Sequence, residues 1–119
     1  MSVILHVEDE VSVRLLYREV FEELGHRVEE AVSGEEALTM LKTARPDIII
    51  LDLKMPGMGG REFLTRFQRL KLKIPIVIST AYPYFESDPA SVAADAYIVK
   101  SGDLGDLVAK VHELLRKHG

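Results

Sequence analysis

Short apolar runs alternate with amphipathic segments along the whole chain, and this alternation limits the possible folds more than any other feature. Five runs have the length of a strand: "VILHV" (3–7), "HRVEEA" (26–31), "DIIIL" (47–51), "IPIVIS" (74–79) and "AYIV" (96–99). Four of them are continuously apolar, which is typical of strands buried on both faces, whereas residues 26–31 alternate and indicate an edge strand. Because parallel strands need a crossover connection, the pattern predicts an α/β fold with a doubly wound parallel sheet.

The handedness of crossovers and the need for a switch point favour strand order 2-1-3-4-5, a five-stranded, flavodoxin-like (βα)5 sandwich. Helices are expected at residues 11–24, at about 60–70 and at 104–115. A further helix is expected to begin at a capping box at Ser33 and to end before Pro46. Gly25 fits a helix C-terminal stop. In the first of these helices, the spacing places four residues on the buried face: Val13, Leu16, Val20 and Leu24.

Length and charge limit the class of protein. A chain of 119 residues buries roughly two-thirds of its extended surface, enough for one core, so residues 1–119 are expected to form a single domain. The net charge of −4 gives no overall attraction for nucleic acid or an anionic membrane, and neither is an expected partner. The chain has no cysteine, which excludes thiolate metal sites, and its start does not resemble a secretory signal. We therefore expect a cytoplasmic protein.

Polar residues follow the predicted strands where each strand ends, and these ends meet at one edge of a parallel sheet. The polar residues are Glu8 and Asp9 after the first strand, Asp52 after the third, Ser79 and Thr80 at the end of the fourth, and Lys100 after the fifth. Each of these residues could have an ordinary role as a helix cap, a turn former or a solvated side chain. Such independent roles would not explain why all of the residues are expected at the same edge of the sheet. Three carboxylates about 4 Å apart repel by roughly 4 kcal/mol per pair at an effective dielectric near 20, so they need a cation. An all-oxygen site favours Mg²⁺, with Mn²⁺ also possible.

The chain resembles the receiver domain of bacterial two-component response regulators. The resemblance covers essentially the whole chain, through "ILHVEDE", "DIIILDLKMPGMGGREFL", "PIVISTA" and "YIVKS". It implies that Asp52 is the phosphoacceptor, and that Thr80 and Lys100 have catalytic roles. It also implies that Thr80 and Tyr97 are the residues that change position when the domain switches between its two states.

The metal ligands implied by the resemblance and by the charges are Asp9, Asp52 and the main-chain carbonyl of Lys54, with Glu8 acting through water. The protein would then be a phosphorylation-switched signalling domain and not an enzyme with a separate substrate. Its implied partners are a sensor histidine kinase or a histidine phosphotransfer protein, which donates the phosphoryl group, and an unknown downstream output domain or protein.

Three other functions remain as alternatives. A degenerate receiver could act only as a docking module, although the intact Asp52, Thr80 and Lys100 argue against this. A metal-dependent aspartyl phosphohydrolase of the haloacid dehalogenase type would have a second aspartate two places after the nucleophile, where this chain has Lys54. A flavodoxin-like electron carrier needs a phosphate-binding loop after the first strand, but "VEDEV" would repel phosphate.

Two departures from the family pattern lead to structural predictions. Ser101 follows Lys100 where the family usually has proline, so we expect a trans peptide bond there, because a cis bond before a non-proline residue costs roughly 2.5–4 kcal/mol. Residues 81–97 form a short connection that contains Pro83 and Pro89, and Ala93 stands where a glycine commonly ends the helix. We expect a helix of about one to two turns near residues 89–94.

Overall fold

The computed structural model describes residues 2–53, 58–81, 94–100 and 103–118 of the chain. Five parallel strands form one sheet in the order β2-β1-β3-β4-β5, as the alternation of apolar runs predicted. The strands are β1 (Val3–Val7), β2 (Arg27–Ala31), β3 (Ile48–Leu51), β4 (Ile76–Thr80) and β5 (Ala96–Val99). The predicted fold class is therefore confirmed.

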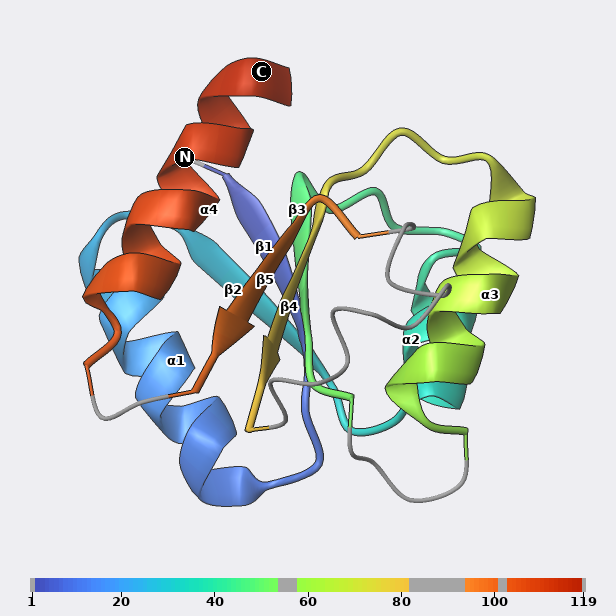
Figure 1. The fold of residues 1–119 in the computed structure, drawn as a ribbon, viewed down its shortest axis with the longest axis horizontal. Coiled ribbons are helices and arrows are strands. Elements are labelled where there is room, and N and C mark those ends of the chain that lie inside the picture. Colours follow the sequence, from blue (N-terminus) through green and yellow to red (C-terminus); the bar gives the residue numbers. More distant parts are fainter. Residues whose placement is uncertain (1, 54–57, 82–93, 101–102, 119) are drawn as a thin grey trace.

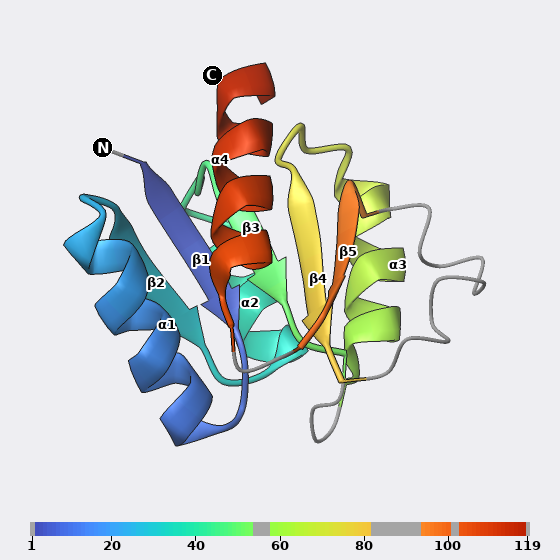
Figure 2. The same ribbon diagram turned by 60° about the vertical axis from the view of Figure 1, so that its left-hand side comes forward.

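Helices cover both faces of the sheet. They are α1 (Val11–Glu23), α2 (Gly34–Met40), α3 (Gly60–Leu70) and α4 (Gly105–His118). Figure 1 shows α1 and α4 on one side of the strands and α2 and α3 on the other, and Figure 2 shows the same layers after rotation. The core accordingly has two parts, one around Phe21 and Val111 and the other around Phe63 and Leu64. No described helix has the length and apolar character needed to cross a bilayer.

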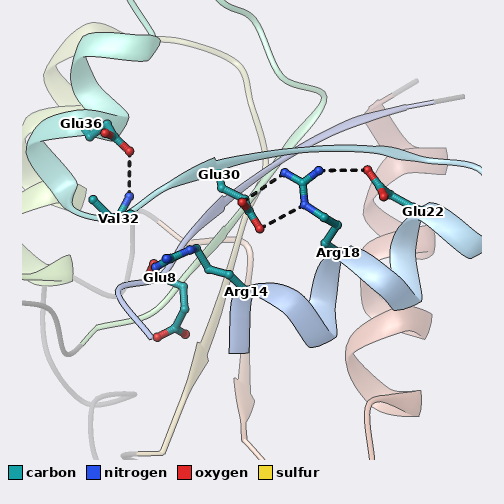
Figure 3. A network of polar contacts seen from close by, with 7 residues as sticks. All are labelled: Glu8, Arg14, Arg18, Glu22, Glu30, Val32 and Glu36. Atoms are coloured by element: carbon teal, nitrogen blue, oxygen red, sulfur yellow. Dashed lines mark hydrogen bonds and ion pairs between the residues drawn. The ribbon is translucent and has the colours of Figure 1, made fainter. Parts of the chain in front are cut away.

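Local sequence signals set the helix ends. Gly25 has a φ of 93°, a conformation that costs glycine little, and its N–H and that of His26 donate to the carbonyls of Glu22 and Phe21. This pattern ends α1 as the sequence predicted. Ser33 accepts a hydrogen bond from the main-chain N–H of Glu36, so the predicted cap of α2 is also present. The carboxylate of Glu36 accepts in turn from the N–H of Val32, the residue before Ser33 (Figure 3).

The predicted buried face of α1 was only partly right: Val13 packs against the core and Val20 is partly buried, but the main contacts with the sheet come from other residues. Tyr17 and Phe21 are the buried residues of this helix, whereas Leu16 and Leu24 are 47% and 48% exposed. Aromatic side chains bury more apolar surface than leucine, so the helix is oriented to place its two rings against the sheet. The periodic pattern of aliphatic residues alone did not contain this information.

The expectation that residues 96–99 are buried on both faces was also wrong. β5 lies at the edge of the sheet opposite β2, its first three residues are only partly buried, and Val99 is 44% exposed. An edge strand has a neighbour on one side only, which leaves part of its surface open. The helix expected near residues 89–94 lies outside the described part of the chain, except for residue 94, and stays a prediction.

Candidate functional site

The three predicted acidic residues come together at the carboxyl edge of the sheet. Glu8 and Asp9 follow β1, and Asp52 follows β3, the strand that pairs with β1. Each offers a carboxylate oxygen, and these oxygens all lie within 4.8 Å of one another. The parallel register thus produces the convergence that the sequence predicted for the carboxylates.

Main-chain hydrogen bonds hold this edge in place. The N–H of Asp52 donates to the carbonyl of Val7 at 3.0 Å, and the N–H of Glu8 donates to the carbonyl of Ala31 at 2.9 Å. Arg14 of α1 donates from Nη1 to the carbonyl of Glu8 at 2.8 Å, and Figure 3 shows how this side chain reaches back from the helix to the end of β1. Asp52 and Glu8 are therefore fixed by the sheet itself and not by a free loop.

Lys100 places a positive charge beside two of these carboxylates. Its Nζ lies 2.9 Å from Oε1 of Glu8 and 3.6 Å from Oδ1 of Asp52. The other oxygen of Glu8 accepts from the N–H of Glu10 at 3.3 Å. Both oxygens of Glu8 are thus engaged within the protein, which leaves Asp9 and Asp52 as the carboxylates better suited to direct contact with a cation.

Burial shapes the electrostatics of the site. Desolvation raises the pKa of Glu8 to about 7, and the charge of Asp52 acts in the same direction, against the hydrogen bond from Lys100. The pKa of Lys100 is raised: desolvation opposes the shift, but the hydrogen bond to Glu8 and the charge of Asp52 outweigh it. Excess negative charge is costly here, and a cation would relieve it.

The donor set fits a hard divalent cation. Carboxylate oxygens are the ligands that Mg²⁺ accepts, and Mg²⁺ sites commonly use one or two carboxylates together with water. Asp9 is partly exposed, so water can reach this edge of the sheet. The predicted carbonyl ligand belongs to Lys54, and the predicted trans peptide joins Lys100 to Ser101; residues 54 and 101 lie outside the described part of the chain.

Thr80 and Tyr97 lie on neighbouring strands. Thr80 is fully buried at the end of β4, and its carbonyl accepts from the N–H of Lys100. Tyr97 is partly buried in β5 and packs against the core on the α2 and α3 side, while its register partner is Ile78. The two residues of the predicted switch are therefore close in the sheet, and their roles stay predictions.

Sequence reasoning missed a buried hydroxyl pair next to the site. Ser79 is buried, and its Oγ lies 2.8 Å from the hydroxyl oxygen of Tyr17 in α1. The ring of His6 stacks on Tyr17 with 4.4 Å between ring centroids, and burial lowers the pKa of His6 to about 3. The alternation of side chains along β4 shows that Ser79 and Thr80 face opposite ways, but no sequence signal identifies Tyr17 as the partner.

A second missed contact joins α4 to the turn after α1. The Nε2 atoms of His26 and His112 are 2.9 Å apart, although the two residues are 86 positions apart in the chain. Neither histidine has a sequence spacing that indicates this contact. Their pairing links α4 to the turn after α1, on the face of the sheet that these two helices cover.

Comparisons with known proteins agree with this geometry. The family model of the response regulator receiver domain matches residues 4–112. Sporulation initiation phosphotransferase F of Bacillus subtilis is 32% identical over 114 residues, covering 94% of this chain and 92% of that protein. The KDP operon transcriptional regulatory protein KdpE of Escherichia coli is 36% identical over 121 residues, covering 99% of this chain but 53% of that protein. The chain thus spans about half the length of several curated relatives that it matches.

Solved structures give the same result. The response regulator protein TrrA from Thermotoga maritima, in complex with Mg²⁺-BeF, has a TM-score of 0.91 and 39% identity, covering 96% of this chain and 99% of that one. A structure of histidine kinase ThkA in complex with TrrA has a TM-score of 0.90 and 40% identity, covering 97% and 99% of the two chains. With the family model, the relatives and the carboxylate site in agreement, the chain belongs to the response regulator receiver domain family of two-component signalling proteins.

Proposed function

We propose that Asp52 accepts a phosphoryl group from the phosphohistidine of a sensor histidine kinase or a histidine phosphotransfer protein, and that the output surface changes in response. The carboxylate cluster of Glu8, Asp9 and Asp52 beside Lys100 is the observation that supports this most. The kinase complex formed by TrrA, to which this chain is similar, supports the class of donor.

In the proposed reaction, a carboxylate oxygen of Asp52 attacks phosphorus, the new O–P bond forms as the P–N bond to the donor imidazole breaks, and the imidazole leaves as the neutral base after taking a proton. Asp52 is held for this attack by the hydrogen bond from its N–H to Val7. Lys100 already lies near Oδ1 of Asp52 at 3.6 Å, so its ammonium can donate to a phosphoryl oxygen with a small movement. Thr80 supplies a hydroxyl donor on the adjacent strand.

Asp9 and Asp52 would hold Mg²⁺ directly, with Glu8 through water and the carbonyl of Lys54 as a further ligand; Mn²⁺ fits the same donors. When bound, the cation offsets the negative charge on the phosphoryl oxygens. The Mg²⁺-BeF complex of TrrA supports Mg²⁺ as the cofactor. The carboxylate positions and the raised pKa of Glu8 support the need for a cation at this edge.

The proposal extends to the whole chain as a single receiver domain, residues 1–119, that works in the cytoplasm and promotes only its own phosphorylation and dephosphorylation. After phosphorylation, Thr80 would move toward the phosphoryl group and Tyr97 would turn inward. This is a change between two states of the same edge of the sheet, biased by the new contacts of the phosphoryl group. The output domain or protein that responds is not specified by the chain.

The test is incorporation of a phosphoryl group from acetyl phosphate in the presence of Mg²⁺, measured by intact mass. We expect one group on the unmodified chain, none on Asp52→Asn, and loss of both Mg²⁺ affinity and labelling on Asp9→Ala. Normal folding of each variant is checked by circular dichroism. Labelling of Asp52→Asn would overturn the assignment of the acceptor. If the unmodified chain binds Mg²⁺ but is not labelled, the docking-module alternative would be favoured.

A further inference from the structure

A hollow between α2 and α3 lies away from the phosphorylation site and has a distinct chemical character. Its volume is about 380 Å³. We call it the α2–α3 groove, and its lining consists of Leu38, Leu41, Lys42, Arg45, Arg66, Leu70 and Leu72. Lys42 and Arg45 precede β3 and Leu72 precedes β4, so the groove lies toward the amino ends of the strands, opposite the edge that carries Asp52 (Figure 1).

The floor of the groove is apolar and continuous with the core. Leu41 is 2% exposed and belongs to the core on this face, and Leu38 and Leu72 pack against that core. Leu70, at the end of α3, is 48% exposed. The groove therefore presents a leucine surface that is only partly covered by the chain itself, and a partner that covers Leu70 would gain the free energy of burying it.

The rim of the groove is cationic. The chain as a whole has 19 acidic and 15 basic residues, yet the lining contains three basic side chains and no acidic one. The sign of the charge at the groove is thus opposite to that of the whole protein. A ligand with acidic groups would be attracted to this position in particular.

These cations are largely available to a ligand. Arg45 donates from Nη1 to the carbonyls of Leu41 and Ala44, which holds its guanidinium at the end of α2. Its other N–H groups donate to no residue in the described part of the chain. Arg66 pairs with Glu62 at 2.8 Å, but both side chains are 53% exposed, and such surface pairs are weak. Lys42 has no ion pair with a described residue.

We propose that the α2–α3 groove docks an acidic amphipathic helix of a partner protein. Such a helix would place leucine-like side chains on the floor and acidic side chains against Lys42 and Arg45 on one side and Arg66 on the other, a helix-in-groove arrangement. The net charge of −4 disfavours an anionic membrane as the occupant. This proposal does not depend on phosphorylation of Asp52.

The experiment uses a fluorescein-labelled synthetic helical peptide with leucines at i, i+3, i+4 and i+7 and flanking glutamates, and a matched peptide with lysine in place of each glutamate. Binding to the unmodified chain is measured by fluorescence anisotropy. We expect the acidic peptide to bind at least about ten-fold more tightly than the basic one, with an affinity that falls as salt is raised. Lys42→Gln and Arg66→Gln should each weaken binding about two- to five-fold.

Two further variants locate the contact. Leu70→Ser removes exposed apolar surface from the floor and should weaken binding, while Lys117→Gln, which removes a cation from the distant end of α4, should leave it unchanged. Asp52→Asn should also bind the peptide normally, which separates this proposal from the function of the acceptor site. Lys42 and Leu70 are exposed, so neither change threatens the fold.

Four results would overturn the proposal. Equal binding of the acidic and basic peptides would remove the charge argument, and full binding by Lys42→Gln and Arg66→Gln would place the peptide elsewhere. Cosedimentation with phosphatidylserine vesicles in the absence of peptide binding would identify a membrane as the occupant. Self-association that is lost in Leu70→Ser, without peptide binding, would identify a second copy of the chain, whose α1 exposes Val11 and Leu15.

Discussion

Replacing Asp52 with asparagine should stabilise the metal-free protein. Asp52 is only 5% exposed and shares its edge of the sheet with Glu8 and Asp9, whose oxygens lie within 4.8 Å of its own. Lys100, with its Nζ 3.6 Å from Oδ1 of Asp52, is an opposing positive charge. Asparagine keeps the shape of the side chain and removes its charge, so the change in stability reports the balance of these interactions.

The magnitude follows from the distances. At an effective dielectric near 20, each carboxylate repels Asp52 by about 3.5 kcal/mol at 4.8 Å, and Lys100 attracts it by about 4.6 kcal/mol at 3.6 Å. When Glu8 and Asp9 are both charged, the net repulsion is about 2 kcal/mol. Salt and the water around partly exposed Asp9 screen part of it, so we expect Asp52→Asn to raise the free energy of unfolding by about 1 kcal/mol.

Urea denaturation at pH 8 in the presence of EDTA measures this difference. With a slope of roughly 2 kcal/mol per molar urea, a gain of about 1 kcal/mol moves the midpoint upward by about 0.5 M. Mg²⁺ should shrink or reverse the difference, because a ligand stabilises the folded protein that binds it and Asp52→Asn binds it less. Glu19→Gln, an exposed change on α1, is the control and should have little effect.

Equal or lower stability of Asp52→Asn in EDTA would refute the reasoning. It would mean that the attraction to Lys100 and the other contacts of Asp52 outweigh carboxylate repulsion. The metal-free site would then not be under electrostatic strain.

Other predictions concern the groups around Asp52. Because burial raises the pKa of Glu8 to about 7 from 4.5, the folded state binds its proton more tightly than the unfolded state does, and the free energy of unfolding should fall by up to about 3 kcal/mol as pH rises from 4.5 through 7. Glu8→Gln should flatten this slope in urea titrations, and an unchanged slope would contradict the assignment. Lys100→Gln should destabilise the protein by about 1–3 kcal/mol at pH 8, because buried Glu8 is left charged without its partner, and by less at pH 5. Equal losses of stability at the two pH values would argue against an ion pair between Lys100 and Glu8. A double-mutant cycle of Tyr17→Phe and Ser79→Ala should give a coupling energy of about 1 kcal/mol, whereas additive effects would show that their hydroxyls do not interact.

The sheet and the carboxylate cluster could be predicted because their signals are local. Continuous apolar runs identify buried strands, strand order follows from crossover geometry, and residues that directly follow parallel strands must meet at one edge. Asp52 could be placed at this edge from its position after a buried strand, whereas its role was implied by the family resemblance. The cap at Ser33 and the stop at Gly25 likewise depend on residues within one turn of the helix.

Contacts that depend on packing between distant elements could not be predicted. The orientation of α1 is set by the rings of Tyr17 and Phe21 against the sheet, and an aliphatic periodicity does not weigh ring size. The pairing of His26 with His112 depends on how α4 lies beside the turn after α1. The predicted strand order already places β5 at an edge, but the continuous apolar run by itself indicated a strand buried on both faces, and Val99 is exposed.

The most direct test of the central claim is to locate the phosphoryl group on the chain. After reaction with acetyl phosphate and Mg²⁺, borohydride reduction converts an aspartyl phosphate to homoserine, which peptide mass spectrometry can place in the sequence. We predict a Mg²⁺-dependent, acid-labile modification at Asp52 and at no other residue. Modification at another carboxylate, or labelling at Asp52 that persists in EDTA, would contradict the account.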